Sequence, residues 1–286
     1  MCKRTFIWQN KGNKAYREKV WFDRWMTEGY SIRQLVSISD HSQEKIRAII
    51  RYWLDHPPAF DVDLSVVKNL IVDGTFLIRR VGIFVIMDAL NHSIVSGKYG
   101  IAENSESQVT CFLNSLKASG LSPISCTTDG NPQVIKVIQA LWPEIIMQRC
   151  VVHVQRQGLM WCRRFPKRTD AKRLRALFLR VTYINNQEER DSFLTGLSSW
   201  EDRYGSSIQS SREGGKVFSD LKRARSMLLK AVPNMFHYLE NPSIPKSTNG
   251  LEGYFSRLKQ HYRNHRGLSE DRRGAYFAWY FYQRKR

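Results

Sequence analysis

Leu70-Ile-Val-Asp-Gly-Thr75 and Ile124-Ser-Cys-Thr-Thr-Asp-Gly-Asn131 are the two stretches that decide the fold of this chain. In each of them a short run of apolar and β-branched residues ends at an Asp-Gly pair, which is typical of a buried strand followed by a turn. Two carboxylates, those of Asp73 and Asp129, are therefore predicted at the ends of two strands. The segments around these strands indicate how they fit into a sheet.

Strand and helix patterns alternate around the two aspartates. Apolar runs predict three more strands, and helical spacing of apolar residues predicts two helices. The strands cover residues 81–87, 93–101 and 145–154, and the helices cover residues 105–118 and 132–141. The resulting order, β-β-β-α-β-α-β, predicts an α/β fold with an RNase H-like catalytic core over residues 64–286.

The second half of the chain is predicted to be mostly helical. Residues from 155 to about 245 carry only helical patterns rich in Arg and Leu, so we expect an all-helical insertion in the core. A helix capped by Ser247 follows, and an aromatic helix over residues 276–282 closes the chain. Its rings could stack on bases, but closing helices of this composition are usually packed in a core.

Residues 1–56 are predicted to hold a helix-turn-helix domain. Apolar residues recur at helical spacing over residues 16–28, and Ser31 and Ser42 can cap two further helices. The polar face of the third helix is the predicted DNA-recognition surface, with Gln43, Lys45, Arg47 and Arg51. The alternative is a plain three-helix subdomain whose charges are only solvated.

The positive charge of the chain is unevenly distributed. The formal net charge of +19 favours double-stranded DNA as a partner, because Lys and Arg gain affinity by releasing counterions from phosphates. The net charge is +6 over residues 1–54, −3 over residues 55–148 and +9 over residues 149–180. An acidic centre between basic segments suits an enzyme that binds divalent metal at its core and phosphate around it.

Nothing in the sequence indicates a membrane partner or a secreted protein. We find no charged-then-apolar leader, and the most apolar stretch, residues 81–90, is too short to span a bilayer and contains Asp88. The five cysteines include no Cys-x-x-Cys pair, so neither a disulfide framework nor a complete zinc finger is indicated. We therefore expect a cytoplasmic protein.

Three carboxylates can carry phosphodiester chemistry. Cleaving or joining phosphodiesters with magnesium needs hard oxygen ligands that hold two ions about 4 Å apart. Asp73 and Asp129 are predicted at neighbouring strand ends, and Glu252 begins a later helix within Ser247-Thr-Asn-Gly-Leu-Glu252. Each aspartate alone is more often a turn residue, and Glu252 alone an exposed helix residue, so the prediction depends on the combination.

Four segments resemble motifs of the Mutator-like DDE transposases, including their bacterial insertion-sequence relatives. Residues 70–75 and 127–131 look like the motifs of the first and second catalytic aspartates, and Cys150-Val-Val-His153 is similar to the Cys-x-x-His element that ends the fifth strand. Residues 247–259 resemble the segment that carries the catalytic glutamate. The motifs occur in the family's order, with 56 positions from Asp73 to Asp129 and 123 from Asp129 to Glu252.

The resemblance implies a DNA transposase that uses two Mg²⁺ ions, for which Mn²⁺ can substitute. By analogy, a metal-activated water frees a 3′-hydroxyl at the element's end, and this hydroxyl attacks target DNA. Asp73, Asp129 and Glu252 would hold the ions, and Cys150 and His153 would be auxiliary residues of the active site. The family implies terminal inverted repeats and target DNA as partners, a homodimer or higher oligomer on DNA, and a nucleoid-associated bacterial protein.

Cys150 and His153 also have plainer interpretations. A buried strand-end cysteine is usually a core residue, and a nearby histidine often only caps a carbonyl. A zinc site built from Cys150, His153 and Cys162 would lack a fourth ligand.

Two further basic stretches are predicted to grip the DNA backbone, because neither has a repeating set of partner acids. The first contains Arg163, Arg164, Lys167 and Arg168. The second contains Arg257, Lys259 and Arg263.

Two other functions fit the sequence. One is a transposase-derived DNA-binding regulator without catalysis, against which the intact set of two aspartates and a glutamate argues. The other is a structure-selective nuclease with the same RNase H-like core, which would not need particular end sequences.

The opening Met1-Cys-Lys-Arg-Thr-Phe6 resembles the closing knuckle of the zinc ribbon that precedes the helix-turn-helix in many bacterial relatives. Structural zinc needs four ligands, and Cys2 has no cysteine or histidine partner before His41. We expect residues 1–12 to be a ribbon remnant that binds no zinc and is poorly ordered. The alternative is an ordinary start with an incidental cysteine.

Overall fold

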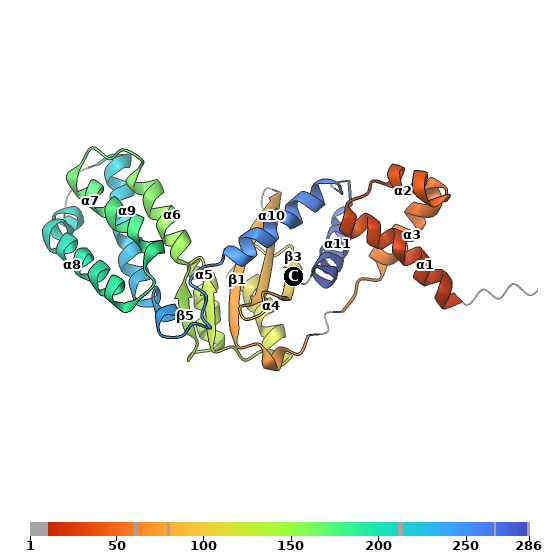
Figure 1. Ribbon diagram of the computed structural model, residues 1–286, viewed down its shortest axis with the longest axis horizontal. Helices are drawn as coiled ribbons and strands as arrows, with labels where there is room; N and C mark the ends of the chain where they lie inside the picture. Colours follow the sequence, from red (N-terminus) through yellow and green to blue (C-terminus); the bar gives the residue numbers. More distant parts are fainter. Residues whose placement is uncertain (1–10, 60–61, 79–80, 211–213, 266, 285–286) are drawn as a thin grey trace, which may run out of the picture.

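A mixed five-stranded sheet lies in the middle of the molecule, with a group of helices at each end (Figure 1). The computed structural model describes residues 11–59, 62–78, 81–210, 214–265 and 267–284. The expectations for Cys2 and the rest of residues 1–10 lie outside the described residues.

The sheet has the strand order β3-β2-β1-β4-β5. Its strands are β1 (Asn69–Ile78), β2 (Val81–Asp88), β3 (Ile94–Tyr99), β4 (Ser125–Thr128) and β5 (Ile146–Arg149). The first three strands are antiparallel neighbours, and β4 and β5 run parallel to β1. Parallel neighbours need crossover connections, and α4 (Glu106–Ala118) and α5 (Pro132–Leu141) supply them. The predicted order of strands and helices is confirmed in this region.

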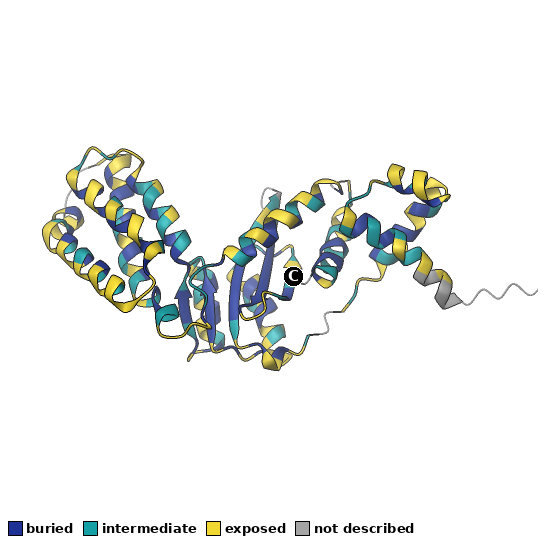
Figure 2. Cartoon of the chain, viewed as in Figure 1, coloured by how far each residue is buried: buried dark blue, intermediate teal, exposed yellow. Residues whose placement is uncertain are grey.

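The two faces of the sheet pack against different helices, because successive side chains of a strand point to opposite sides. On one face Leu70 of β1 shares a buried cluster with Val109 of α4 and Val134 of α5. On the other face Ile71 of β1 lies in a cluster with Leu251 of α10 (Asn249–Arg263) and with the aromatic side chains of α11 (Glu270–Gln283). Helices therefore cover both faces of the sheet, which is buried dark blue in Figure 2.

Helices and a π-helical turn precede the sheet. They are α1 (Lys11–Asp23), the turn η1 (Arg24–Glu28), α2 (Ile32–Ser39) and α3 (Gln43–Asp55). The predicted caps are confirmed, because the hydroxyls of Ser31 and Ser42 accept hydrogen bonds at 3.2 Å from the backbone N–H groups of Gln34 and Lys45. Gly29, with a φ of 73°, ends η1 in a conformation that favours glycine.

These N-terminal helices dock on α11 and share its core. Trp25 packs edge-on against Tyr276 with ring centroids 5.8 Å apart, and the indole N–H of Trp279 donates to the carbonyl oxygen of Trp53 at 2.6 Å. One buried cluster contains residues of η1, α3, α10, α11 and the sheet. The first and last elements of the chain thus stabilise each other.

A second group of helices lies at the opposite end of the sheet (Figure 1). It consists of α6 (Val151–Cys162), α7 (Thr169–Arg180), α8 (Gln187–Ser210) and α9 (Lys216–Ala231). These helices enclose a hydrophobic cluster of their own, which includes Leu174, Phe193 and Leu228. Apart from the first turn of α6, they occupy the part of the chain for which the sequence predicts only helices, and we call them the helical unit.

One predicted strand is wrong in its second half. The strand expected over residues 145–154 ends at Arg149, and the next residue, Cys150, is already the N-cap of α6. His153 therefore lies in the first turn of a helix and not at a strand end. The backbone N–H of Val151 bonds to the carbonyl of Lys246, far away in the sequence, and that of Val154 begins the helical pattern by bonding to Cys150. An apolar Cys-Val-Val run fits a buried strand or a buried helix equally well.

Candidate active site

Asp73 and Asp129 lie side by side because of the register of two parallel strands. Val72 of β1 pairs with Thr128, the last residue of β4, so the next residues along the two strands are the two aspartates. The prediction that Asp73 ends a strand is wrong, since β1 continues to Ile78 as the antiparallel partner of β2. Asp73 instead marks the point at which the neighbouring strand β4 stops.

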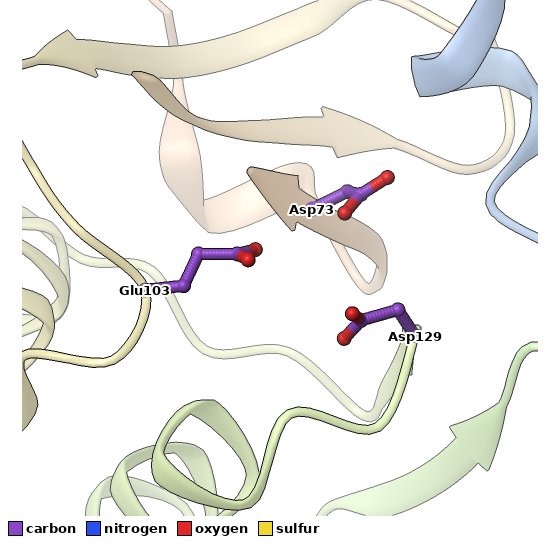
Figure 3. A group of neighbouring side chains, drawn as sticks. All are labelled: Asp73, Glu103 and Asp129. Carbon is purple, nitrogen blue, oxygen red and sulfur yellow. The ribbon is translucent and has the colours of Figure 1, made fainter. Parts of the chain in front are cut away.

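A third carboxylate, that of Glu103, reaches the aspartates from the loop after β3 (Figure 3). Carboxylate oxygens of Asp73, Glu103 and Asp129 lie within 4.8 Å of one another. Gly74 makes room for this arrangement, because a Cβ added at Gly74 would lie 2.5 Å from Cγ of Glu103. The glycine after Asp73 is thus required by close packing inside a strand, and not by a turn. We call these three residues the carboxylate cluster.

Burial and repulsion by neighbouring carboxylates make Asp73 and Glu103 hard to ionise. Asp73 is 6% exposed, and its burial, followed by the charges of Glu103 and Asp129, raises its pKa to about 8. Burial and the charge of Asp129 raise the pKa of Glu103 to about 7. A cation bound among such groups favours their ionised forms and offsets the repulsion. Divalent magnesium and manganese prefer such oxygen ligands, so the cluster is a candidate metal centre.

Glu252, the third ligand predicted from the sequence, lies in the first turn of α10 and lines the same pocket. It does not belong to the carboxylate cluster. Its two oxygens accept hydrogen bonds from Nη1 and Nη2 of Arg156 on α6, at 3.0 and 3.1 Å. Nε2 of His153 lies 3.3 Å from the same carboxylate. The structure therefore brings together two of the three predicted ligands and places the third in an ion pair with α6.

Cys150, His153 and Thr248 form a hydrogen-bonded group beside the carboxylates. Nδ1 of His153 lies 3.2 Å from Sγ of Cys150 and 3.3 Å from the hydroxyl of Thr248, whose backbone N–H donates to the same sulfur at 3.3 Å. The contact with Cys150 is the main cause that raises the pKa of His153 to about 9, and the charges of Asp73 and Asp129 add to it. Burial raises the pKa of Cys150, but hydrogen bonds from His153 and Thr248 outweigh it and leave that pKa lowered.

A zinc site with Cys162 does not fit this group. Cys150 and Cys162 lie at opposite ends of α6, which places them about 18 Å apart at the rise of an α-helix. Among the described residues, Cys150, His153 and Cys162 do not form a group that could hold a metal ion.

The sequence as a whole matches one family. A model of the family described as "Transposase, Mutator family" matches residues 22–265, which is most of the chain. The chain belongs to the Mutator family of transposases. It is therefore a DNA-binding protein and, in general terms, an enzyme that cleaves or transfers nucleic acid, for which a divalent metal is expected. A search of proteins with curated descriptions gave no match.

None of the helices in the described part of this transposase is both long and apolar enough to cross a bilayer.

The side chains predicted to contact DNA from α3 of the transposase differ in their surroundings. Gln43, Arg47 and Arg51 are exposed. Lys45 is half-buried, and its Nζ lies 2.5 Å from Oε1 of Glu18 on α1. Part of the positive charge of Lys45 is thus neutralised within the N-terminal helices.

Two arginines of the basic stretch between α6 and α7 have acidic partners, which the sequence did not indicate. Nη2 of Arg163 lies 3.3 Å from Asp220, and Nη2 of Arg168 lies 2.8 Å from Asp170. The first partner is 57 residues away in the sequence, so no local charge pattern could have indicated it. Arg164 and Lys167 are exposed and are the better candidates for contact with DNA.

The basic residues of α10 lie partly in the carboxylate pocket and partly on the exposed surface of the helix. Lys259 lines the pocket, whereas Arg257 and Arg263 are exposed. The aromatic residues of α11 are core residues as predicted for Tyr276, Phe277, Trp279, Tyr280 and Phe281, which are all buried, whereas Tyr282 is 39% exposed.

Sequence reasoning missed Glu103, Arg156 and Thr248. Glu103 lies in a loop without a motif of its own, and its sequence signal is only its position just after β3, a strand of the same sheet that β2 separates from β1. Arg156 lies three residues after His153, so its place on the same helical face follows once α6 begins at Val151.

Proposed function

We propose that the chain is a DDE-type DNA transposase with an RNase H-like catalytic core, which cuts strands at the ends of its element and joins them to target DNA. The observation that carries the proposal is the carboxylate cluster of Asp73, Glu103 and Asp129, at the point where the parallel pairing of β1 and β4 ends. The strand order, with β1 to β3 antiparallel and β4 and β5 parallel to β1, supports the RNase H-like assignment. Membership of the Mutator family supports transposition.

The carboxylate cluster fits a divalent metal centre. The sheet positions Asp73 and Asp129, and the loop after β3 positions Glu103, so that all three present oxygens to one point. When bound, a pair of Mg²⁺ or Mn²⁺ ions activates a nucleophile and neutralises charge on the leaving oxygen of a phosphodiester.

Glu252 belongs to the same proposed active site, but its carboxylate is bound by Arg156 and is not free to bind a metal ion. Arg156 is exposed, and a guanidinium binds a phosphate in the same bidentate manner as it binds a carboxylate. A DNA phosphate that engages Arg156 would therefore release Glu252, which lines the pocket of the cluster. We infer that Glu252 completes the set of acidic ligands only when DNA is bound.

His153 would hold the phosphate beside the cluster. With its pKa raised to about 9, its imidazole is a cation at neutral pH, and it is half-buried beside the pocket. Cys150 and Thr248 both contact Nδ1 of His153, so Nε2 is directed toward Glu252. In this proposal Cys150 and Thr248 are positioning residues, because they act through His153.

The remaining elements would bind and orient the DNA. We propose that α2 and α3 form a helix-turn-helix within residues 1–56 that recognises the terminal inverted repeats through Gln43, Arg47 and Arg51. Residues 64–286 would be the catalytic domain. The exposed residues Arg164, Lys167, Arg257 and Arg263 would contact the backbone of element or target DNA. A homodimer or higher oligomer on DNA is the expected active form.

A cleavage assay tests the proposal. The purified chain is incubated with a labelled duplex that ends in the element's terminal repeat, or with random DNA, in Mg²⁺, Mn²⁺ or EDTA. We expect metal-dependent nicks at the repeat end that leave a 3′-hydroxyl, joined products with a plasmid target, and neither product with Asp129→Asn. Binding without cleavage in either metal would favour a regulator. Equal cleavage of random or branched DNA would favour a structure-selective nuclease.

A further inference from the structure

A second pocket shares a loop with the carboxylate cluster. Gly130 and Pro132, which follow Asp129, form one wall, and Arg149 at the end of β5 lies beside them. Trp161 of α6 and one face of α9 form the opposite wall. The cavity has a volume of about 490 Å³, which is in the range of sites that bind small organic ligands. It lies between the proposed catalytic loop and the helical unit.

The charge of this pocket is strongly positive. Lys222 and Lys230 lie eight positions apart on α9 and thus on the same face, and Arg149 faces them from the sheet. Arg223 also lines the pocket, although its Nη1 lies 3.8 Å from Asp220. No described acidic residue lines the cavity. A concave surface whose described charged residues are all cations attracts an anion.

Arg149 connects the pocket to the proposed catalytic loop. Its Nη2 donates to the backbone carbonyl of Asp129 at 3.3 Å, and its buried Nε has no hydrogen-bond partner among the described residues. Gly130 has a φ of 98°, and a Cβ added there would lie 1.9 Å from Cζ of Arg149. The glycine of the second Asp-Gly pair therefore lets a guanidinium lie directly against the loop that carries Asp129.

The remaining wall of the pocket is apolar. The half-buried indole of Trp161 and the side chain of Met227 lie on the side formed by the helical unit. An aromatic platform beside a row of cations is the combination that binds nucleotides, because a base stacks on the ring while the cations bind its phosphate. A simple phosphate site would not need the aromatic wall.

We propose that this pocket binds one unpaired nucleotide of the DNA substrate, with its base against Trp161 and its phosphate held by Arg149 and Lys230. The inference rests on the proposed function in one respect, namely that the strand is cut beside Asp129. A strand at that position passes Arg149, because Arg149 contacts the carbonyl of Asp129. A paired base is already stacked within its duplex, so a cavity of this size accepts a base only from a single strand or a frayed end.

Photocrosslinking and binding in EDTA test this inference without any need for cleavage. The probe is a short single-stranded oligodeoxynucleotide that contains 5-iododeoxyuridine, mixed with the full chain. We expect irradiation to attach the probe to Trp161, as mapped by mass spectrometry. Trp161→Ala should weaken binding of the probe on the order of ten-fold, and Trp161→Phe, which keeps a stacking surface, should largely restore it.

The cationic half of the pocket has a matched control on the same helix. Lys230→Gln should weaken binding and lower the dependence of log affinity on log salt by about one. Lys216→Gln removes the same charge from an exposed position at the start of α9 that does not line the pocket, and should leave binding unchanged. Parental affinity in both Trp161→Ala and Lys230→Gln, or a Trp161→Phe variant as weak as Trp161→Ala, would overturn the proposal.

Two further outcomes separate this proposal from others. If inorganic phosphate displaces the probe as well as deoxyadenosine monophosphate does, the pocket is a phosphate site and the role of Trp161 is overturned. A different measurement tests the proposed transposase chemistry, which would be contradicted if the parent chain showed no metal-dependent cleavage. Binding in EDTA and cleavage in Mg²⁺ can therefore fail independently.

Discussion

Asp73 and Glu103 lower the stability of the folded protein whenever they are ionised without a cation. A buried carboxylate loses hydration, and each further negative charge in the pocket makes ionisation of its neighbours harder. Burial is the larger cause for both Asp73 and Glu103, and repulsion by neighbouring carboxylates adds to it. The side chains that would bind metal most tightly are thus also those that the metal-free protein tolerates least at high pH.

We expect the metal-free protein to lose stability as the pH rises from about 4 to 9, between the ordinary pKa values of these groups and their raised folded-state values. Asp73 and Glu103 have folded-state pKa values of about 8 and about 7, above the ordinary 3.8 and 4.5, so the folded state holds protons that the unfolded state has released. Their stabilising contribution is complete below the ordinary values and is lost as the pH passes 7 and 8. His153, raised from 6.5 to about 9, acts in the same direction.

Melting temperatures measured against pH, with and without Mg²⁺, check this expectation. Because metal binding requires the ionised carboxylates, the increase caused by Mg²⁺ should grow with pH. Asp73→Asn should flatten both curves. An increase of the same size at low and high pH would contradict the assignment of the metal centre.

Replacement of single acids by amides separates the metal ligands from their neighbours. We expect Asp73→Asn, Asp129→Asn and Glu103→Gln each to lower DNA cleavage by more than about 100-fold, which exceeds the usual effect of an outer-shell partner. The matched control is Glu106→Gln, because Glu106 is exposed on α4 and pairs with Lys136. Near-parental cleavage by Glu103→Gln, with loss in the two aspartate variants, would remove Glu103 from the metal centre.

Arg156→Gln tests whether the ion pair withholds Glu252 from the metal centre. Loss of the guanidinium leaves Glu252 with His153 alone, so we expect Mn²⁺ affinity without DNA to rise by about ten-fold, as for other changes in partners of a ligand. Calorimetric titration measures this. The gain should vanish in the double variant with Glu252→Gln, which is the diagnostic of coupling between the two side chains. Parental Mn²⁺ affinity in Arg156→Gln would mean that Glu252 is not a latent ligand.

Helices whose ends carry local signals were predicted best. Asn131 caps α5 and Pro132 begins it, and the helix covers the predicted residues 132–141. The boundary between β5 and α6 has no such signal, because a tertiary contact from Val151 to the backbone of Lys246 helps to set it. A capping residue acts on neighbours in the sequence, whereas this boundary depends on a segment almost one hundred residues away.

The active site, like the helix boundaries, was predictable only where the signal is local or follows from the order of the strands. Asp73 and Asp129 could be paired from the sequence because the predicted order places the first and fourth strands side by side, although β1 continues to Ile78 and only β4 ends at the pair. Glu103 could not be, since a loop side chain reaches the site only through the space left by Gly74. The ion pair of Glu252 with Arg156 was also beyond the sequence, because it depends on where α6 begins.

The exposed arginines of α3 are expected to contact DNA, and Lys45 on the same helix serves as the control. Arg47→Ala and Arg51→Ala should each weaken DNA binding and lower the dependence of log affinity on log salt by about one, since both side chains are exposed. Lys45→Ala should change the salt dependence less, because Lys45 is paired with Glu18. Titration of terminal-repeat DNA at several salt concentrations measures this. An equal effect of all three substitutions would argue against a specific recognition face.

The molecule as a whole is organised around separate cores. The helical unit encloses its own cluster, whereas the N-terminal helices share one with α10, α11 and one face of the sheet. The proposed boundary between residues 1–56 and 64–286 therefore divides the sequence but not the packing. A rigid connection of this kind would fix the distance between the proposed recognition helix and the carboxylate cluster, and hence the distance between the bound repeat and the cleavage point.

Trp25→Ala tests whether recognition and catalysis share one folding unit. Trp25 is 4% exposed and contacts Tyr276 and His265, so truncation should cost about 3–5 kcal/mol of unfolding free energy. Val20→Ala, at a site 40% exposed on α1, should change stability by less than about 0.5 kcal/mol. Since the damaged cluster also contains Ile71 of β1, we expect Mn²⁺ binding and DNA binding to be lost together as urea rises. If Trp25→Ala lost DNA binding at low urea while Mn²⁺ binding kept its parental midpoint, the N-terminal helices would be an independent domain.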